Sequence, residues 1–134
     1  MLGGDTVGMD VLSSRVLYRC GDFDSLRRFY GDILGLHPSR EYGDAAGIAG
    51  VVFFLGGGFL ELVREGPPSP SISLWLQVRD VSGEVARLAA AGVVVAKPAQ
   101  RMPWGLVECW IHDPEGNELR LVEVPEDHPL RRRL

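Results

Sequence analysis

The residue types that most often perform chemistry are few in this chain, and their spacing limits what they could do. The three histidines, His37, His112 and His128, have no ligand spacing among them, and no serine–histidine–aspartate arrangement is visible. Cys20 is expected on the core side of its strand, where a thiol packs as a small apolar group. These residues therefore indicate neither nucleophilic catalysis nor a histidine-based metal site.

Two carboxylates and several aromatic side chains remain as candidates. Glu61 and Glu108 could act as an acid–base pair, although nothing in the sequence sets the distance between them. Aromatic side chains could form stacking walls for a flat ligand, because they bury a large area at little entropic cost. The aromatic candidates are Phe59, Trp75, Trp104 and Trp110, of which Trp110 is expected in the core.

The elements that must position these residues begin with an alternating strand at 15–20. Apolar residues at 26, 29, 30, 33 and 34 then recur with the period of a helix, which Asp24 or Ser25 can cap and Gly35 ends. Three short strands are predicted at 39–42, 50–55 and 59–64, and the glycines at 56–58 join the last two. A proline-containing linker follows at 67–70.

The second half of the chain repeats this pattern. A clean alternating strand covers 71–78, a helix capped by Ser82 and ended by Gly92 covers 80–91, and strands are predicted at 93–96, 106–111 and 119–124. Asp22 and Asp80 lie 58 positions apart, and Glu61 and Arg120 lie 59 apart. One βαβββ unit therefore occurs twice.

Length and composition are those of one globular domain. The chain has 134 residues, 46% of them hydrophobic and 24% charged, and no apolar run approaches the roughly 20 residues that cross a bilayer. A net charge of −4 with scattered cations argues against nucleic-acid binding. With two cysteines and no visible secretory signal, a cytoplasmic setting is expected. We expect a flexible segment at 1–12, one domain at 13–125 with modules at 13–66 and 71–125, and a solvated tail at 126–134.

The alternation also predicts which side chains point away from the helices. Because unpaired buried polar groups cost about 1–3 kcal/mol each, these polar and amphipathic residues favour a wet hollow of ligand size over a second core. The expected fold is α+β, with two tandem βαβββ modules that form a curved mixed sheet, or half-barrel, around a cavity and carry their helices outside. The residues expected on this face are Arg15, Leu17, Arg19, Ser71, Ser73, Trp75 and Gln77.

These features resemble the vicinal oxygen chelate superfamily, which includes glyoxalase I, bleomycin-resistance proteins and extradiol dioxygenases. The resemblance spans residues 13–125 and depends on the order of several short motifs. It is closest to the metal-free bleomycin-resistance branch at Trp104–Gly105. The motifs are Phe29–Tyr30, Leu34–Gly35, Phe59–Leu60–Glu61–Leu62, Pro103–Trp104–Gly105 and Asp113–Pro114–Glu115–Gly116–Asn117.

In metal-dependent members, the resemblance implies four ligand positions on the first and last strands of the two halves. Here those positions carry Arg15, Glu61, Ser73 and Arg120. Only the glutamate could bind a divalent ion tightly, because arginine stays protonated and serine is a weak ligand. We therefore expect no metal or other cofactor at this site.

Three functional hypotheses remain open. The first is a metal-free binding protein that sequesters an aromatic or anionic small molecule, with a pocket formed by Arg15, Leu17, Phe59, Glu61, Ser73, Trp75, Gln77, Trp104 and Arg120. The second is a lyase, isomerase or dioxygenase with a metal bound by ligands that are not recognised. The third is a structural remnant in which Arg15, Glu61 and Arg120 form only a buried salt bridge. A homodimer is expected, and the sequence leaves open whether the modules pair within one chain or across two.

Overall fold

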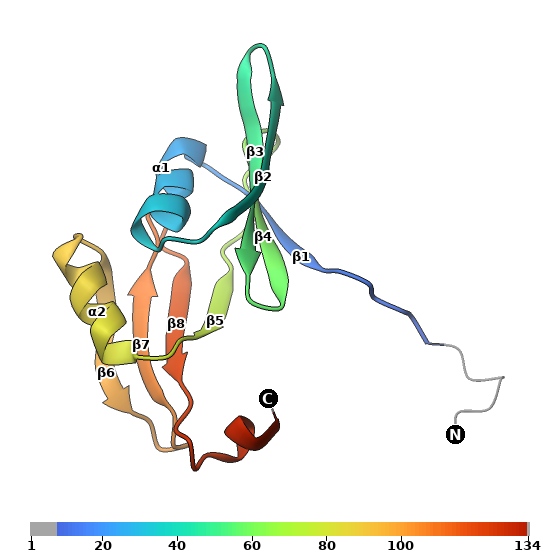
Figure 1. The fold of residues 1–134 in the computed structure, drawn as a ribbon. Coiled ribbons are helices and arrows are strands. Elements are labelled where there is room, and N and C mark those ends of the chain that lie inside the picture. The colour runs from blue at the N-terminus through green and yellow to red at the C-terminus, as the bar shows by residue number, and fades with distance from the viewer. Residues whose placement is uncertain (1–7, 134) are drawn as a thin grey trace.

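The computed structural model describes residues 8–133 (Figure 1), so the expected flexibility of residues 1–7 lies outside the described part of the chain. The first module contains β1 (Arg15–Arg19), α1 (Phe23–Arg28), a π-helical turn (Phe29–Ile33), β2 (Pro38–Asp44), β3 (Gly47–Leu55) and β4 (Gly58–Val63). The second module contains β5 (Ser73–Gln77), α2 (Val81–Ala90), β6 (Val94–Arg101), β7 (Val107–His112) and β8 (Glu118–Glu123). A 3-10 turn (Pro129–Arg133) follows.

Each module forms its own four-stranded mixed sheet. The strand order is β1-β4-β3-β2 in the first sheet and β5-β8-β7-β6 in the second. In each sheet the first and last strands of the module pair in parallel, and the other neighbours are antiparallel. The predicted α+β class and the duplicated unit are therefore confirmed.

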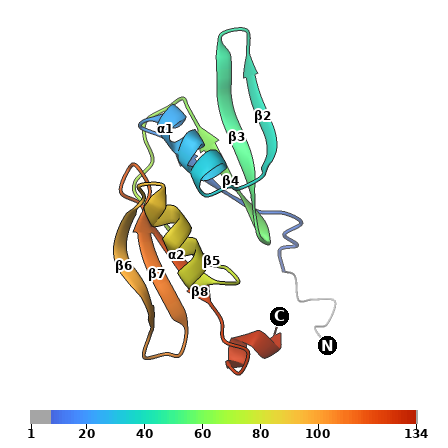
Figure 2. The ribbon, with the colours of Figure 1, turned by 60° about the vertical axis from the view of Figure 1, so that its left-hand side comes forward.

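One apolar core joins the two modules. Leu26 and Tyr30 from the first helical segment, Leu60 from β4, Leu88 from α2 and Ile111 from β7 all belong to it. In both views α1 lies beside the first sheet and α2 beside the second (Figure 2). The opposite face of each sheet, which no helix within residues 8–133 covers, is called here the open face. Cys20 and Cys109 are both buried in the core as free thiols, as predicted for Cys20.

The helix caps lie earlier than predicted, by two or three residues in the first repeat and by two in the second. The carboxylate of Asp22 accepts a hydrogen bond from the Ser25 amide at 3.2 Å, and that of Asp80 accepts one from the Gly83 amide at 3.1 Å. The predictions of Asp24 or Ser25 and of Ser82 as caps are therefore wrong. Aspartate satisfies an otherwise unpaired amide two or three residues into the helix, and both copies of the unit use it at the same place.

Two segments expected to be loops are strands. Residues 42–50 form the turn end of the β2–β3 hairpin, and β6 continues to Arg101 although it contains Pro98. The pairing of β6 with β7 shifts register on both sides of Lys97, and β6 is an edge strand. Proline is tolerated there because an edge strand does not need every amide for pairing.

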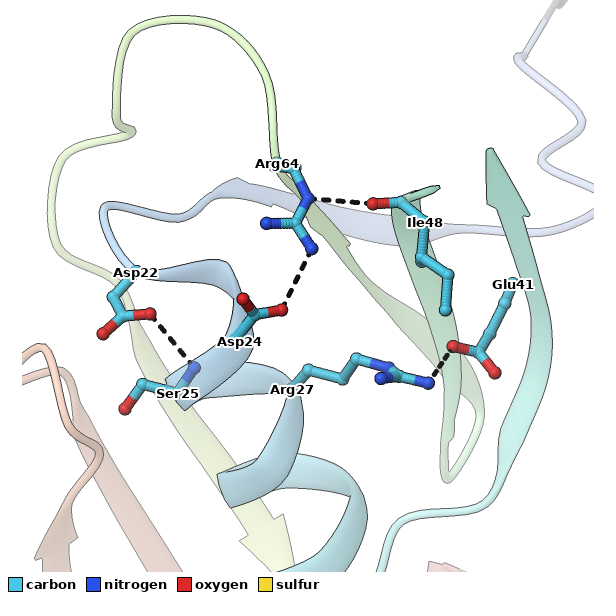
Figure 3. Close-up of polar contacts among 7 residues, drawn as sticks. All are labelled: Asp22, Asp24, Ser25, Arg27, Glu41, Ile48 and Arg64. Atoms are coloured by element: carbon cyan, nitrogen blue, oxygen red, sulfur yellow. Dashed lines mark hydrogen bonds and ion pairs between the residues drawn. The ribbon is translucent and has the colours of Figure 1, made fainter. Parts of the chain in front are cut away.

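The β2–β3 hairpin is anchored to α1 by charged side chains (Figure 3). Arg64 donates from Nε to the Ile48 carbonyl at 2.8 Å and from its terminal nitrogen to Asp24 at 3.0 Å. Arg27 on α1 forms an ion pair with Glu41 on β2. These contacts hold in place the strand that carries two residues of the first open face, as described below.

The two modules are also joined by polar contacts from the turn at 113–117. Tyr30 donates to the buried carboxylate of Asp113 at 2.7 Å, and Tyr18 donates to Glu115 at 2.8 Å. Burial, followed by the neighbouring carboxylate, raises the pKa of Tyr30, which therefore remains a donor. Within residues 8–133, no helix is long and apolar enough to cross a membrane.

Candidate functional site

The strand pairing aligns equivalent rows of side chains across the two open faces. In the first sheet, Leu17 pairs with Glu61, Glu61 with Val52, and Val52 with Arg40. In the second sheet, Trp75 pairs with Arg120, Arg120 with Trp110, and Trp110 with Lys97. Each row therefore ends in a cation on the hairpin edge and in an apolar side chain on the first strand of the module.

A carboxylate that is hydrogen-bonded on both sides, Glu61, lies at the centre of the first open face. Glu61 is only 9% exposed, accepts a hydrogen bond from Arg15 at 2.8 Å, and accepts another from the hydroxyl of Tyr42. Burial acts to raise the pKa of Glu61, but the hydrogen bonds from Tyr42 and Arg15 outweigh it, so the net pKa lies below the ordinary value. Glu61 is thus an ionised acceptor at neutral pH and a poor candidate for a general base.

Tyr42 reaches Glu61 because its ring crosses over a glycine. A Cβ atom built on Gly50 would lie 2.3 Å from the Tyr42 ring and hydroxyl, which is closer than atoms can approach. Burial and the hydrogen bond to Glu61 raise the pKa of Tyr42 to about 12. The phenol therefore stays protonated and acts as a donor across the physiological range.

A second held carboxylate lies on the other open face. Glu108 is 2% exposed and accepts from both indole nitrogens nearby, at 2.7 Å from Trp104 and 2.9 Å from Trp110. One oxygen of the carboxylate serves each indole. Glu108 thus orients two aromatic planes, and about half of the Trp104 side chain remains exposed.

Two cations stack on the ring of Trp110. The guanidinium of Arg120 lies 4.0 Å from the ring centroid, and the ammonium of Lys97 lies 4.9 Å from it. Arg120 also forms an ion pair with Glu118 at 2.8 Å. Trp110 is therefore not in the helix-side core, as the sequence had suggested, but on the open face with its ring covered by positive charge.

The nine predicted pocket residues fall into two groups. Four lie on the first open face, four on the second, and Trp104 lies in the connection between β6 and β7. The predicted ion pair between Arg15 and Glu61 is present, but Arg120 lies on the other sheet and does not complete a three-residue salt bridge. The first group is Arg15, Leu17, Phe59 and Glu61, and the second is Ser73, Trp75, Gln77 and Arg120.

The residues at the family's four metal-ligand positions do not suit a divalent ion. Arg15 and Arg120 have no lone pair to donate, and the oxygens of Glu61 are already occupied by Arg15 and Tyr42. Within residues 8–133 no group of three or more histidine, cysteine or acidic side chains is arranged to hold a metal.

Four open-face residues near the site were not predicted from the sequence. Arg40 lies 5.3 Å from the Tyr42 ring centroid, and Phe54 packs against Phe59 at 5.4 Å between centroids. The other two are Tyr42 and Lys97. The sequence predicted a strand at 39–42, and its alternation puts Arg40 and Tyr42 on one face, but nothing in the sequence assigned that face to the site.

Comparison with known proteins is consistent with this fold. The family model described as the glyoxalase, bleomycin resistance protein and dioxygenase superfamily matches residues 13–121. No curated protein matches the chain in sequence.

Among solved structures, TioX from Micromonospora sp. ML1 is 22% identical with a TM-score of 0.74, covering 84% of this chain and 98% of its own. TnmS3, an antibiotic-binding protein from Streptomyces sp. CB03234, is 22% identical with a TM-score of 0.74, covering 89% and 100%. A lactoylglutathione lyase from Agrobacterium tumefaciens is 20% identical with a TM-score of 0.67, covering 86% and 94%. These likenesses establish a shared fold, and the family match extends over most of the chain. The chain belongs to the glyoxalase, bleomycin resistance protein and dioxygenase superfamily.

Proposed function

We propose that this protein binds a small molecule with a planar aromatic part, without a metal, in a cavity that a second copy of the chain completes. The proposal depends on which groups of the open faces have partners within the chain and which do not. Their carboxylates are already satisfied by neighbouring donors, while large apolar side chains remain uncovered. An unused aromatic surface beside fixed polar groups is what a binding site for a flat ligand requires.

The uncovered apolar surface lies on both open faces. Four apolar side chains are each about half exposed: Leu17 and Phe54 on the first open face, Trp75 on the second, and Trp104 beside the second. Burying such side chains is favourable by about 25 cal/mol per Å², so a ligand or partner that covered them would gain free energy. Scattered single exposed residues need no explanation, but two of these four lie beside a hydrogen-bonded carboxylate, since Leu17 pairs with Glu61 and Trp104 donates to Glu108.

The involvement of a second copy is supported by the separation of the two faces. None of the main cavities in residues 8–133 is lined by Glu61 together with Trp75 or Arg120. β1 and β5 are both edge strands, with one neighbour each. In a two-fold dimer the first open face of one copy would meet the second open face of the other, and both edges would gain a neighbour.

The relatives support binding without deciding between binding and catalysis. TnmS3 is described as an antibiotic-binding protein, whereas another structural neighbour is a lactoylglutathione lyase. The lost metal-ligand chemistry at Arg15 and Arg120 favours the first class. A functional metal would have to use residues other than these.

A ligand screen combined with elemental analysis tests the proposal. Protein purified without chelator should contain no stoichiometric divalent metal, and planar aromatic compounds should raise its melting temperature and quench its tryptophan fluorescence. Trp75→Ala should abolish both effects, while Leu130→Ala, a change of another exposed apolar side chain in the C-terminal turn, should leave them intact. Stoichiometric zinc, nickel, iron or manganese, or the absence of any aromatic ligand, would contradict it.

A further inference from the structure

From the charges on the open faces we infer that the ligand is an aromatic acid: a planar ring system that carries a carboxylate or another stable anion. The inference rests on the proposed function and narrows it. A cationic or neutral aromatic compound would not use the cations described below, whereas an anion beside the ring would.

Every carboxylate of the site is already hydrogen-bonded to a donor of its own module. Glu61 is held by Arg15 and Tyr42, Glu108 by two indole groups, and Glu118 by Arg120. Each of these carboxylates is therefore hydrogen-bonded within the chain and needs no cationic ligand as a partner. A positively charged ligand would also have to displace one of these contacts before it could form an ion pair.

The cations at the hairpin ends of the two rows, in contrast, have no partner of opposite charge within residues 8–133. Among the described residues, neither Arg40 nor Lys97 has an ion-pair partner, and each lies against an aromatic ring. Arg40 stacks on Tyr42 and Lys97 on Trp110, at matching positions of the duplicated unit. Each open face therefore offers a cation that forms no ion pair among the described residues and lies directly beside an aromatic plane; the charge of Arg40 also helps to lower the pKa of Glu61.

This juxtaposition selects for an acid attached to a ring. The aromatic part of the ligand can cover the exposed apolar side chain at one end of a row, such as Trp75. Its anion can then accept hydrogen bonds from the cation at the other end, such as Lys97, three strand spacings of about 4.8 Å away. The chain as a whole is negatively charged, with a net charge of −4, so an anionic ligand is not attracted by the overall field. Preference for an acid would have to arise from these local cations.

A matched series of three probes tests the inference: anthraquinone-2-carboxylate, its neutral carboxamide, and the corresponding aminomethyl cation. The wild-type protein should bind the carboxylate at least about tenfold more tightly than the amide, and the amine most weakly, as measured by tryptophan quenching. Replacing both cations, Arg40→Gln with Lys97→Gln, should reduce the preference for the carboxylate over the amide to less than about threefold. Arg28→Gln, a charge change on an exposed residue of α1, should leave the preference unchanged.

The possible outcomes distinguish failure of this inference from failure of the proposed function on which it rests. Equal or tighter binding of the amide or the amine would overturn the preference for acids and leave aromatic binding standing. Failure of all three probes to bind would contradict the proposed function itself and the inference with it. An unchanged preference in the double variant would show that Arg40 and Lys97 do not recognise the acid.

Discussion

The two open faces solve the same physical problem with different side chains. Each buries one carboxylate in the middle of a half-exposed sheet and supplies it with two donors. On the first face the donors are a guanidinium and a phenol, and on the second they are two indoles. The first arrangement fixes charge, while the second fixes aromatic planes, so a duplicated scaffold has become a polar half and a stacking half.

The equivalent rows explain how the two halves diverged. Where the first sheet has Val52 beside Glu61, the second has Trp110 beside Arg120. A guanidinium is attracted to the face of an indole, whereas a carboxylate is repelled by the same electron-rich face. The exchange of valine for tryptophan therefore goes with the exchange of glutamate for arginine, and it removes the second acid that a metal site would need.

The largest effect is expected from Glu108→Gln. Because the amide has only one acceptor oxygen, one partly buried indole N–H would lose its partner and face an amide donor instead. We expect a loss of about 2–3 kcal/mol in the free energy of unfolding, measured by urea denaturation. The same change made together with Trp104→Phe should cost clearly less than the two single changes added, and strict additivity would argue against the shared carboxylate.

Glu61→Gln is expected to cost less, about 1 kcal/mol, because its partner Arg15 is 41% exposed and water can replace much of the interaction. The measurement is again urea denaturation at neutral pH. If Glu61→Gln were as costly as Glu108→Gln, the proposed contrast between a carboxylate paired with a solvent-exposed arginine and a more deeply buried one paired with two indoles would be wrong.

Gly50→Ala tests the crossing of Tyr42 over β3 and should cost about 1 kcal/mol through loss of the Tyr42–Glu61 hydrogen bond. The displaced phenol should also lose its perturbation, so that its pKa falls from about 12 towards 10 in an ultraviolet titration. In a Tyr42→Ala background, where no ring lies in the way, Gly50→Ala should have little effect. A similar cost in both backgrounds would indicate another cause.

Acid should remove the contribution of Glu61. Because the folded chain holds the pKa of this carboxyl below its ordinary value of 4.5, the contribution is complete above pH 4.5 and is lost as pH falls through the lower folded value. The stability difference between wild type and Glu61→Gln should therefore shrink below pH 4.5. A difference that grows in this range would show that the folded pKa is raised.

The smallest expected effect is that of a chelator. Since no metal is expected between Arg15, Glu61, Ser73 and Arg120, EDTA should shift neither the melting temperature nor the affinity for an aromatic ligand. Added zinc, nickel or manganese should likewise leave the melting temperature unchanged. A chelator-sensitive melting temperature would point to ligands outside these positions.

Local patterns in the sequence predicted the fold and part of the site. Strict alternation in the first strand of each module placed Leu17 and Trp75 on the same kind of face, because side chains in a strand alternate whatever its partner is. The helix caps were missed by a few residues, since aspartate, serine and threonine are nearly equivalent as caps and only geometry selects one of them.

Contacts between distant segments could not be predicted. The approach of Tyr42 to Glu61 depends on a hairpin whose glycines at 43, 47 and 50 interrupt alternation and made the segment resemble a loop. The placement of Trp110 on the open face depends on the register of β7, which an apolar and aromatic strand does not reveal by itself. The separation of Glu61 from Arg120 is a property of how the modules pack, and short-range patterns carry no information on it.

The central claim is that one metal-free site is built from the first open face of one copy and the second open face of another. Complementation between two inactive variants tests it directly. Leu17→Glu would place a repelling charge on the first face, and Trp75→Glu on the second. Both positions are exposed, so the fold should tolerate the changes.

Each variant alone should bind no anthraquinone-2-carboxylate. An equimolar mixture, unfolded and refolded together, should regain about a quarter of the wild-type sites, because half of the dimers are mixed and each has one intact site of two. Recovery of binding to about that level is the predicted result. A mixture as inactive as its parents would contradict the account, because a site contained within one chain cannot be restored by mixing.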